Sequence, residues 1–278
     1  MATSRESVMK KTTNKIEINK LYVNDCVKFM QKLDDNFIDL TVTSPPYDNL
    51  RDYKGFSFQF NKIARELFRI TKPGGTVVWV VGDKIVDGNR SLTSFKQALY
   101  FQESGFKVHD VMIYRKKNTP FMRSNAYTNA FEFMFVFSKQ KVKTFHALKE
   151  PTVRSGFEMV PFNKLSDGVN KKVLKELKKE KTRTNIWAYA VGLGGSTNDK
   201  FAFKHPAVFP EKLAEDHILS WTKEGDLVFD PMVGSGTTCK MALLNNRNFL
   251  GCDISSEYIE IARKRISLAR KQMLIPGI

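Results

Sequence analysis

The chain has 278 residues, 42% of them hydrophobic, and a formal net charge of +16, so it can form one large domain or a domain with a smaller insert. The positive charge favours a polyanionic partner, and the absence of any run of ~20 apolar residues excludes a membrane-spanning helix. Three cysteines without a Cys-x-x-Cys pair and four scattered histidines exclude a disulfide framework and a recognisable metal site, so we expect a reduced, metal-free, cytoplasmic protein.

The first half of the chain alternates segments typical of strands and of helices. Residues 1–14 are polar, lack a signal-peptide core and are expected to be a flexible basic N-terminus. A helix is predicted between Tyr53 and Ile70 and ends at Lys72-Pro73-Gly74-Gly75, and a second helix is predicted from Ser94 to Glu103. The predicted strands are Leu21–Asn24, Ile38–Thr43, Thr76–Val81, Lys107–Tyr114 and Phe131–Phe137, the last two forming an antiparallel hairpin.

Positive charge is concentrated between Lys139 and Arg183, where thirteen Lys and Arg stand against five Asp and Glu. The segment from Lys171 to Glu180 has apolar residues at helical spacing, which predicts a surface helix whose lysines can face phosphates. Phosphate contacts give salt-sensitive affinity but carry no sequence information. If the polyanion is a nucleic acid, recognition of its bases needs amide or guanidinium donors. The sequence offers five candidates and does not choose among them: Arg154, Asn163, Asn170, Arg183 and Asn185.

Strands and helices also alternate in the last part of the chain. Predicted strands Leu227–Phe229 and Phe249–Cys252 flank a helix-forming run from Cys239 to Leu244, and an amphipathic helix follows from about Ser256 to Met273, capped by Ser255 or Ser256. Interleaved strands and helices predict an α/β fold, an open and mostly parallel seven-stranded sheet with the antiparallel hairpin at one edge. Ligands of such sheets bind at the carboxyl ends of the strands.

The segment Ser44-Pro45-Pro46-Tyr47 ends the predicted strand Ile38–Thr43. Two consecutive prolines lack backbone N–H groups and stop the hydrogen-bond ladder, so the segment is a stiff, extended loop. A hydroxyl, a fixed carbonyl and an aromatic ring at the end of a strand can hold a planar, amine-bearing ring such as a nucleobase. A Pro-Pro turn with a packing tyrosine is the alternative interpretation.

A glycine-containing turn, Phe229-Asp230-Pro231-Met232-Val233-Gly234-Ser235-Gly236-Thr237-Thr238, joins a predicted strand to a predicted helix. Glycines at such a turn let a ligand approach the backbone. Asp253 ends the next predicted strand, 19 positions after Gly234, which is an interval suited to binding two ribose hydroxyls. The combination favours a nucleoside cofactor, although a Gly-x-Gly alone is also typical of a plain turn.

These two loops resemble those of the amino-methylating DNA methyltransferases, and their order along the chain resembles the beta group of that family. The resemblance extends from about Leu21 to Arg270 and is weakest in the middle. It implies a Rossmann-like methyltransferase sheet, S-adenosyl-L-methionine as cofactor, double-stranded DNA as partner and a bacterial, cytoplasmic enzyme of the restriction–modification type. A cognate restriction endonuclease and a homodimer occur with such enzymes, and the sequence decides neither.

The resemblance also implies roles for individual residues. The catalytic residues would be Ser44, Pro45, Pro46 and Tyr47, with the Ser44 oxygen and the Pro45 carbonyl accepting hydrogen bonds from the exocyclic amine and Tyr47 stacking on a flipped base. The Asp25 carboxylate would bind the cofactor's adenine amine, and Asp230 would hold its methionine ammonium. The cofactor-binding residues implied are Asp25, Cys26, His205, Pro206, Phe229, Asp230, Pro231, Gly234, Gly236, Thr237, Thr238 and Asp253.

Serine in the first position of the catalytic loop, preceded by Thr43, resembles the N4-cytosine enzymes, whereas aspartate is usual in the N6-adenine enzymes. The preferred expectation is therefore N4-cytosine methylation of duplex DNA by direct in-line transfer. N6-adenine methylation, methylation of RNA or another amine, and a non-catalytic nucleic-acid-binding protein are the alternatives. The predicted organisation is an N-terminal segment (1–14), a catalytic half (15–138), a basic target-recognition insert (139–185) and a cofactor-binding half (186–278).

Overall fold

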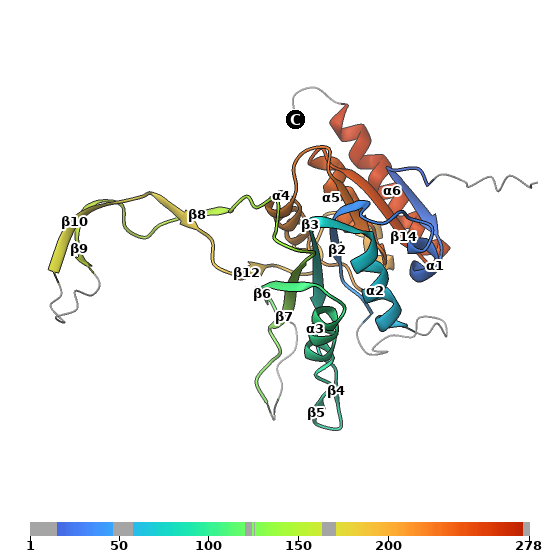
Figure 1. The fold of residues 1–278 in the computed structure, drawn as a ribbon, viewed down its shortest axis with the longest axis horizontal. Coiled ribbons are helices and arrows are strands. Elements are labelled where there is room, and N and C mark those ends of the chain that lie inside the picture. The colour runs from blue at the N-terminus through green and yellow to red at the C-terminus, as the bar shows by residue number, and fades with distance from the viewer. Residues whose placement is uncertain (1–15, 47–57, 120–123, 125, 163–170, 275–278) are drawn as a thin grey trace, which may run out of the picture.

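The computed structural model describes residues 16–46, 58–119, 124, 126–162 and 171–274 (Figure 1). Its centre is an eight-stranded sheet in the order β1-β14-β13-β2-β3-β7-β6-β12. Seven strands run in the same direction, and β7 alone is antiparallel to its neighbours. In sheet order the strands are Lys20–Val23, Asn248–Asp253, Leu227–Asp230, Ile38–Thr43, Thr71–Val81, Phe131–Ser138, Lys107–Lys116 and Ile186–Tyr189. The predicted mostly parallel α/β sheet is therefore confirmed.

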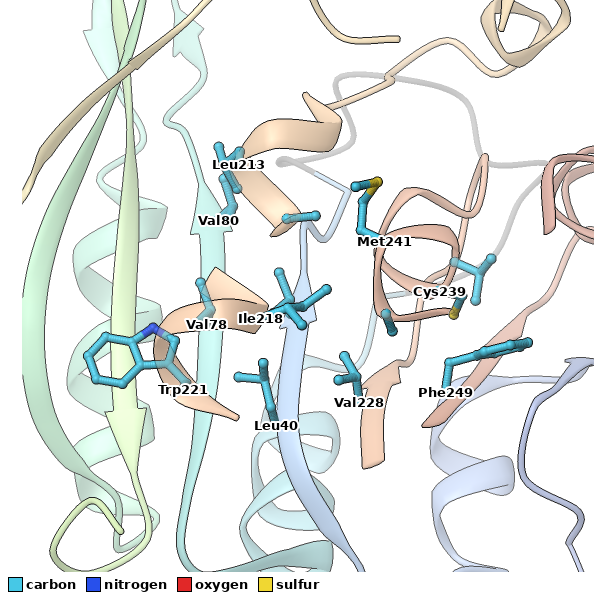
Figure 2. Packing of buried hydrophobic residues seen from close by; sticks show 14 of the residues in the cluster. Leu40, Val78, Val80, Leu213, Ile218, Trp221, Val228, Cys239, Met241 and Phe249 are labelled. Carbon is cyan, nitrogen blue, oxygen red and sulfur yellow. The ribbon is translucent and has the colours of Figure 1, made fainter. Parts of the chain in front are cut away.

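Helices cover both faces of this sheet. Residues alternate between the faces along β3, where Val78 and Val80 belong to one hydrophobic cluster and Val77 and Trp79 to the other. The first cluster includes buried residues of α4 (Glu211–Trp221), α5 (Thr237–Leu244) and α6 (Ser256–Met273), as Figure 2 shows for Val78, Val80 and Ile218. The second includes residues of α1 (Cys26–Met30), α2 (Phe60–Ile70) and α3 (Thr93–Glu103). A helix–sheet–helix sandwich with two separate cores results.

The predicted helix ends agree with the capping chemistry of the sequence. The Asp25 side chain accepts a hydrogen bond from the Lys28 N–H at the start of α1, and the Ser255 hydroxyl accepts one from the Tyr258 N–H at the start of α6. Part of the helix predicted between Tyr53 and Ile70 lies outside the described residues, as do Tyr47 and residues 1–14.

The helix predicted from Lys171 to Glu180 is wrong. Lys171–Leu177 is a strand, β10, which pairs antiparallel with β9 (Gly156–Phe162). A second short pair, β8 (Lys149–Pro151) with β11 (Glu180–Thr182), continues this two-stranded arm toward the main sheet (Figure 1). Apolar Val173 and Leu174 find cross-strand partners in Val160 and Met159, and strand pairing outweighs the helical spacing of the single segment.

The sheet has one more strand than the sequence predicts. β12 pairs in parallel with β6, so the β6–β7 hairpin does not form the edge of the sheet. β12 is short, and its buried Trp187 packs against Tyr189 and His217. The predicted start of β3 at Thr76 is also wrong, because the strand begins at Thr71 and includes the Pro-Gly-Gly segment that the sequence predicts to be a terminator.

Three further elements lie outside the main sheet. A short hairpin is formed by β4 (Ile85–Val86) and β5 (Asn89–Arg90), and a 3-10 helix, η1, spans Lys200–Lys204.

No helix among the described residues is long and apolar enough to cross a membrane. Strands from residues 15–138 and 186–278 interleave, since β13 and β14 lie between β1 and β2.

Candidate active site

The loops that follow β2 and β13 begin side by side at the same edge of the sheet. The two strands are neighbours, with Phe229 paired to Thr41. The Thr43 hydroxyl donates a 2.8 Å hydrogen bond to Oδ1 of Asp230, and the Thr238 hydroxyl donates a 3.0 Å bond to the Val42 carbonyl. Ser44, which follows Thr43, therefore lies next to the start of the glycine loop.

The proline loop is described as far as Pro46. Pro45 is buried, whereas Ser44 and Pro46 are half-buried, so the loop is held against the domain with its surface partly accessible. Tyr47 lies outside the described residues, and its stacking role stays a prediction.

Asp230 is a buried carboxylate at the carboxyl end of β13, with 1% of its surface exposed. Its Oδ1 accepts hydrogen bonds from the Thr43 hydroxyl and, at 3.1 Å, from the Met232 N–H. Burial raises the pKa of Asp230 to about 6, although the hydrogen bonds oppose that shift. A buried carboxylate with an elevated pKa is suited to a cationic ligand, because an ammonium group would stabilise its charged form.

The backbone of the glycine loop requires glycine at two positions. Gly234 has φ +50°, and a Cβ atom there would lie 2.8 Å from Nε2 of His205. Gly236 has φ +85°, and its Cβ would lie 2.6 Å from the Cβ of Ala262 on α6. The loop therefore packs tightly between His205 and α6.

Asp253 ends β14 and binds the glycine loop directly. Its Oδ2 accepts a 2.8 Å hydrogen bond from the Gly234 N–H, and its Oδ1 accepts one of 2.9 Å from the Ser255 N–H. Burial raises the pKa of Asp253 above its usual range. One function of this carboxylate, missed at the sequence level, is thus to fix the backbone of the loop.

Asp25 and Cys26 approach the same edge from the N-terminal side. β1 pairs with β14 so that Val23 lies opposite Asp253, and the Asn24 N–H donates to the Asp253 carbonyl at 2.9 Å. Burial and the charge of Asp25 raise the pKa of the Cys26 thiol to about 12, so this cysteine stays protonated. Three carboxylates, those of Asp25, Asp230 and Asp253, thus lie at the carboxyl ends of three adjacent strands.

His205 supports the glycine loop from the side. Its ring is buried, stands edge-on to Tyr258 with a centroid distance of 4.4 Å, and has Nδ1 2.8 Å from the Ala207 carbonyl. The neighbouring Pro206 is exposed. The predicted site residues Phe229, Thr237 and Thr238 are buried, and the Phe229 ring stacks in the core with Phe29 at 6.2 Å, which leaves its backbone for any ligand contact.

A buried charge cluster beneath the glycine loop is absent from the sequence predictions. The guanidinium of Arg265, with 0% exposure, donates to the Ser235 carbonyl at 2.9 Å and to the Thr237 hydroxyl at 3.0 Å. It also forms ion pairs with Asp199 and Glu211, which Lys240 binds as well at 2.8 Å and 2.7 Å. Arg265 lies on the buried side of α6, between Ala262 and Ala269. Its helical spacing from these apolar residues is the feature of the sequence from which its burial could be predicted.

A second buried carboxylate, Asp216, holds the chain where it leaves β11 of the two-stranded arm. It accepts from Arg183 at 2.7 Å, from the Tyr189 hydroxyl at 2.6 Å and from Lys212 at 2.6 Å. Arg183 also lies over the Trp187 ring at 4.7 Å. These contacts make Arg183 a structural anchor, and base reading by Arg183, one of the five candidates, stays a prediction.

Other base-reading candidates also have partners within the protein. Asn185 donates to Asp110 at 3.3 Å and to the Val111 carbonyl at 3.1 Å, and Arg154 pairs with Glu158 at 3.3 Å. Asn163 and Asn170 lie outside the described residues.

The residues at this sheet edge fit S-adenosyl-L-methionine, the cofactor expected from the sequence. A buried carboxylate suits an ammonium group, a carboxylate at the end of the following strand suits a ribose diol, and a third, Asp25, suits an aromatic amine. The loop between them has glycine at positions 234 and 236, where a side chain would collide with His205 and Ala262, respectively.

Comparisons with known proteins identify the family. A family model described as DNA methylase matches residues 38–264. The orphan methyltransferase M.BamHII of Bacillus amyloliquefaciens is 52% identical over 241 residues, which cover 85% of this chain and 91% of that protein. The type II methyltransferase M.BglII of Bacillus subtilis is 27% identical over 270 residues, covering 91% and 70%.

Solved structures share the fold. The PvuII DNA methyltransferase (cytosine-N4-specific) matches with a TM-score of 0.64 and 19% identity over 93% of this chain and 87% of that one. A DNA modification methylase of Thermus thermophilus, complexed with S-adenosyl-L-methionine, matches with a TM-score of 0.60 and 23% identity over 93% and 96%. The residues matched by the family model include both loops described above, and the chain therefore belongs to the S-adenosyl-L-methionine-dependent, amino-methylating DNA methyltransferases of the beta group.

Proposed function

We propose that this DNA methyltransferase modifies the exocyclic N4 of cytosine in duplex DNA. The observation that carries the proposal is serine at the first position of the proline loop, after Thr43 and beside Asp230. Serine offers a neutral hydroxyl oxygen to the target amine, where aspartate would offer a charged carboxylate. The Thr-Ser-Pro-Pro segment resembles the N4-cytosine enzymes of the family.

The catalytic task is to make a weak nucleophile reactive. The lone pair of an exocyclic amine is delocalised into the ring, and hydrogen bonds from the amine to the Ser44 oxygen and the Pro45 carbonyl would localise it on nitrogen. Pro45 is buried, which fixes the carbonyl in place. Positioning of this kind can supply ~7–11 kcal/mol of rate enhancement.

The cofactor supplies an electrophilic methyl group on a sulfonium. We propose that the Asp230 carboxylate binds its ammonium group, that Asp253 binds its ribose hydroxyls, and that Asp25 accepts from its adenine amine. Cys26, His205, Pro206, Phe229, Pro231, Gly234, Gly236, Thr237 and Thr238 would complete this site, His205 by packing against Gly234. Because Thr43 binds Asp230, the same hydrogen bond would set the spacing of the two substrates.

We further propose that residues 139–185 are the target-recognition insert. Residues 15–138 would supply the catalytic loop together with Asp25 and Cys26, and residues 186–278 would supply the other cofactor-binding residues. Thirteen basic residues between Lys139 and Arg183 support duplex DNA as the partner of this insert. Bacterial relatives named as type II methyltransferases support a cytoplasmic, restriction–modification role, whereas the 52% identical relative is named an orphan methyltransferase, so a partner nuclease need not exist.

The deciding experiment identifies the methylated nucleoside. DNA treated with the protein and labelled S-adenosyl-L-methionine is digested to nucleosides and analysed by mass spectrometry. N4-methylcytosine is expected. N6-methyladenine would overturn the base assignment and leave the mechanism intact, and unmodified DNA that is nevertheless bound would favour a non-catalytic protein.

A further inference from the structure

The strands β9 and β10 form a two-stranded ribbon at the end of the insert. They make a sheet of their own, which Figure 1 draws at the tip of an arm that reaches away from the main sheet. Isolated two-stranded ribbons are marginally stable in water, and a ribbon of this kind gains from a partner that covers one of its faces.

The two faces of the ribbon differ in chemistry. Residues directly opposite each other in an antiparallel pair share a face, so Met159 lies beside Leu174, and Phe157 beside Glu176, on one face. We call this the apolar face, because it carries the large apolar side chains of Phe157, Met159 and Leu174. These side chains are 71%, 57% and 64% exposed, respectively. Three large apolar residues so exposed are typical of an interaction surface.

The apolar residues of the opposite face, Val160, Val173 and Leu177, are less exposed than those of the apolar face. The same face carries Glu158, which lies opposite Lys175 and pairs with Arg154 at 3.3 Å. The cross-strand pair on this face is Val160 with Val173, one position along from the pair Met159 with Leu174. The ribbon thus contains two neighbouring apolar cross-strand pairs, one on each face.

The charge around the apolar face selects its partner. Exposed Lys172 lies on the same face as Leu174, and the stem carries the exposed lysines Lys149, Lys178, Lys179 and Lys181. A second copy of this chain would bring the same net charge of +16 and is disfavoured by repulsion. A polyanion is favoured, and duplex DNA is the polyanion on which this family acts.

The dimensions of DNA fit a ribbon of this width. Paired strands lie ~4.8 Å apart, and the major groove of B-DNA, about 12 Å wide, admits a two-stranded ribbon. Apolar side chains there can contact the methyl group of thymine, and flanking lysines can reach the phosphates. We propose that β9 and β10 enter the major groove with Phe157, Met159 and Leu174 facing the base edges, an inference that rests on the proposed role of the insert.

The two cross-strand pairs provide a matched test. The double variant Met159→Ala, Leu174→Ala alters the apolar face, and Val160→Ala, Val173→Ala alters the opposite face. Their affinities are measured by fluorescence anisotropy for a duplex of about 30 base pairs, roughly three turns of B-DNA, that contains the sequence methylated by the wild-type protein, and for a scrambled duplex. Hydrogen exchange of the β9 and β10 amides shows whether each variant keeps its ribbon.

The apolar-face variant should bind the duplex with the target sequence ~10–100-fold more weakly than the wild-type protein does. Its affinity for scrambled DNA and the salt dependence of binding should change little, since its phosphate contacts remain. The opposite-face variant should stay within about twofold of wild type. Equal losses in both variants with an intact ribbon, or no loss in the apolar-face variant, would overturn the proposal. Conversion of a wild-type dimer to a monomer by the apolar-face variant would assign that face to a second copy. Methylation by the wild-type protein tests the proposed function separately, and its outcome does not depend on either variant.

Discussion

The hydroxyl of Thr43 donates a 2.8 Å hydrogen bond to the carboxylate of Asp230, and both side chains are almost completely buried. The bond joins the last residue of β2, immediately before Ser44, to the last residue of β13, immediately before the glycine loop. A second bond, from Thr238 to the Val42 carbonyl, lies alongside it. The proline loop and the glycine loop are therefore positioned by the same contacts.

Substitution Thr43→Val should uncouple the two loops. Valine has the shape of threonine but donates no hydrogen bond, so a buried carboxylate loses one of its donors at a cost of about 1–3 kcal/mol in unfolding free energy. We expect turnover to fall ~10-fold or more, with Thr43→Ser close to wild type. Single-turnover kinetics and urea unfolding of both variants check this. Equal activity of valine and serine at this position would remove the coupling role.

Binding of S-adenosyl-L-methionine should weaken below about pH 6. The pKa of the buried Asp230 is raised to about 6, and the carboxyl must be charged to hold an ammonium group. Cofactor binding near pH 6 should therefore release protons, which calorimetry in two buffers of different ionisation enthalpy measures. Asp230→Asn should bind the cofactor more weakly and lose most of this pH dependence. Thr43→Val should move the midpoint of the pH dependence to higher pH, because the Thr43 hydrogen bond lowers the pKa of Asp230.

The same shift has a defined sign for stability. The folded state binds the Asp230 proton more tightly than the unfolded state, whose pKa is 3.8, so this group's contribution to stability is lost as the pH rises from about 4 to about 6. In the absence of cofactor, Asp230→Asn should therefore be more stable than wild type at pH 7.5, by about 2–3 kcal/mol, and similar at pH 4. Urea unfolding at the two pH values decides, and a variant less stable at pH 7.5 contradicts the assigned burial cost.

Ser44→Ala and Asp253→Ala should fail in different ways. Ser44→Ala should lower kcat strongly and leave the cofactor Kd nearly unchanged, because the hydroxyl is assigned to the target amine. Asp253→Ala should raise the cofactor Kd, since it removes both the carboxylate that we propose to bind the ribose diol and the acceptor of the Gly234 N–H. Isothermal titration and steady-state kinetics separate the two patterns. An effect of Ser44→Ala confined to cofactor affinity would contradict its role.

Arg265→Met should destabilise the domain by about 1–3 kcal/mol, because it leaves the half-buried Asp199 and Glu211 with Lys240 as their remaining cation and removes a buried donor from the glycine loop. The cofactor Kd should also rise, since Arg265 binds Ser235 and Thr237 of the glycine loop. Lys271→Met, at an exposed position of the same helix, is the control and should lie within about 0.5 kcal/mol of wild type. Urea unfolding gives both values, and similar behaviour of the two variants would exclude a supporting role for the cluster.

The parts of the fold that sequence predicts well have strong local signals. β2 ends at Thr43 because two prolines follow, and α6 begins after Ser255 because its hydroxyl caps the helix. The Gly234 turn and the Asp253 strand end are likewise set by local chemistry. These signals also bring the two loops to one sheet edge, since parallel neighbouring strands end on the same side.

The parts that sequence does not predict depend on contacts distant along the chain. Lys171–Leu177 has apolar residues compatible with either period, and only its pairing with β9 makes it a strand. Arg265, Asp199 and Glu211 resemble surface charges when each is taken alone, and the two half-buried carboxylates permit burial of the Arg265 guanidinium. The pairing of Arg183 is likewise not visible in the sequence, because its partner Asp216 lies on a helix 33 positions later.

The pairing of β1 with β14 has a consequence for how the enzyme matures in the cell. Asp25 and Asp253 meet only when the strand from the far end of the chain has left the ribosome and docked against the first strand. A nascent chain that ends before β13 lacks Asp230, the carboxylate that holds Thr43, and one that ends before β14 lacks Asp253. We therefore expect methylation activity to begin only after β14 has been translated.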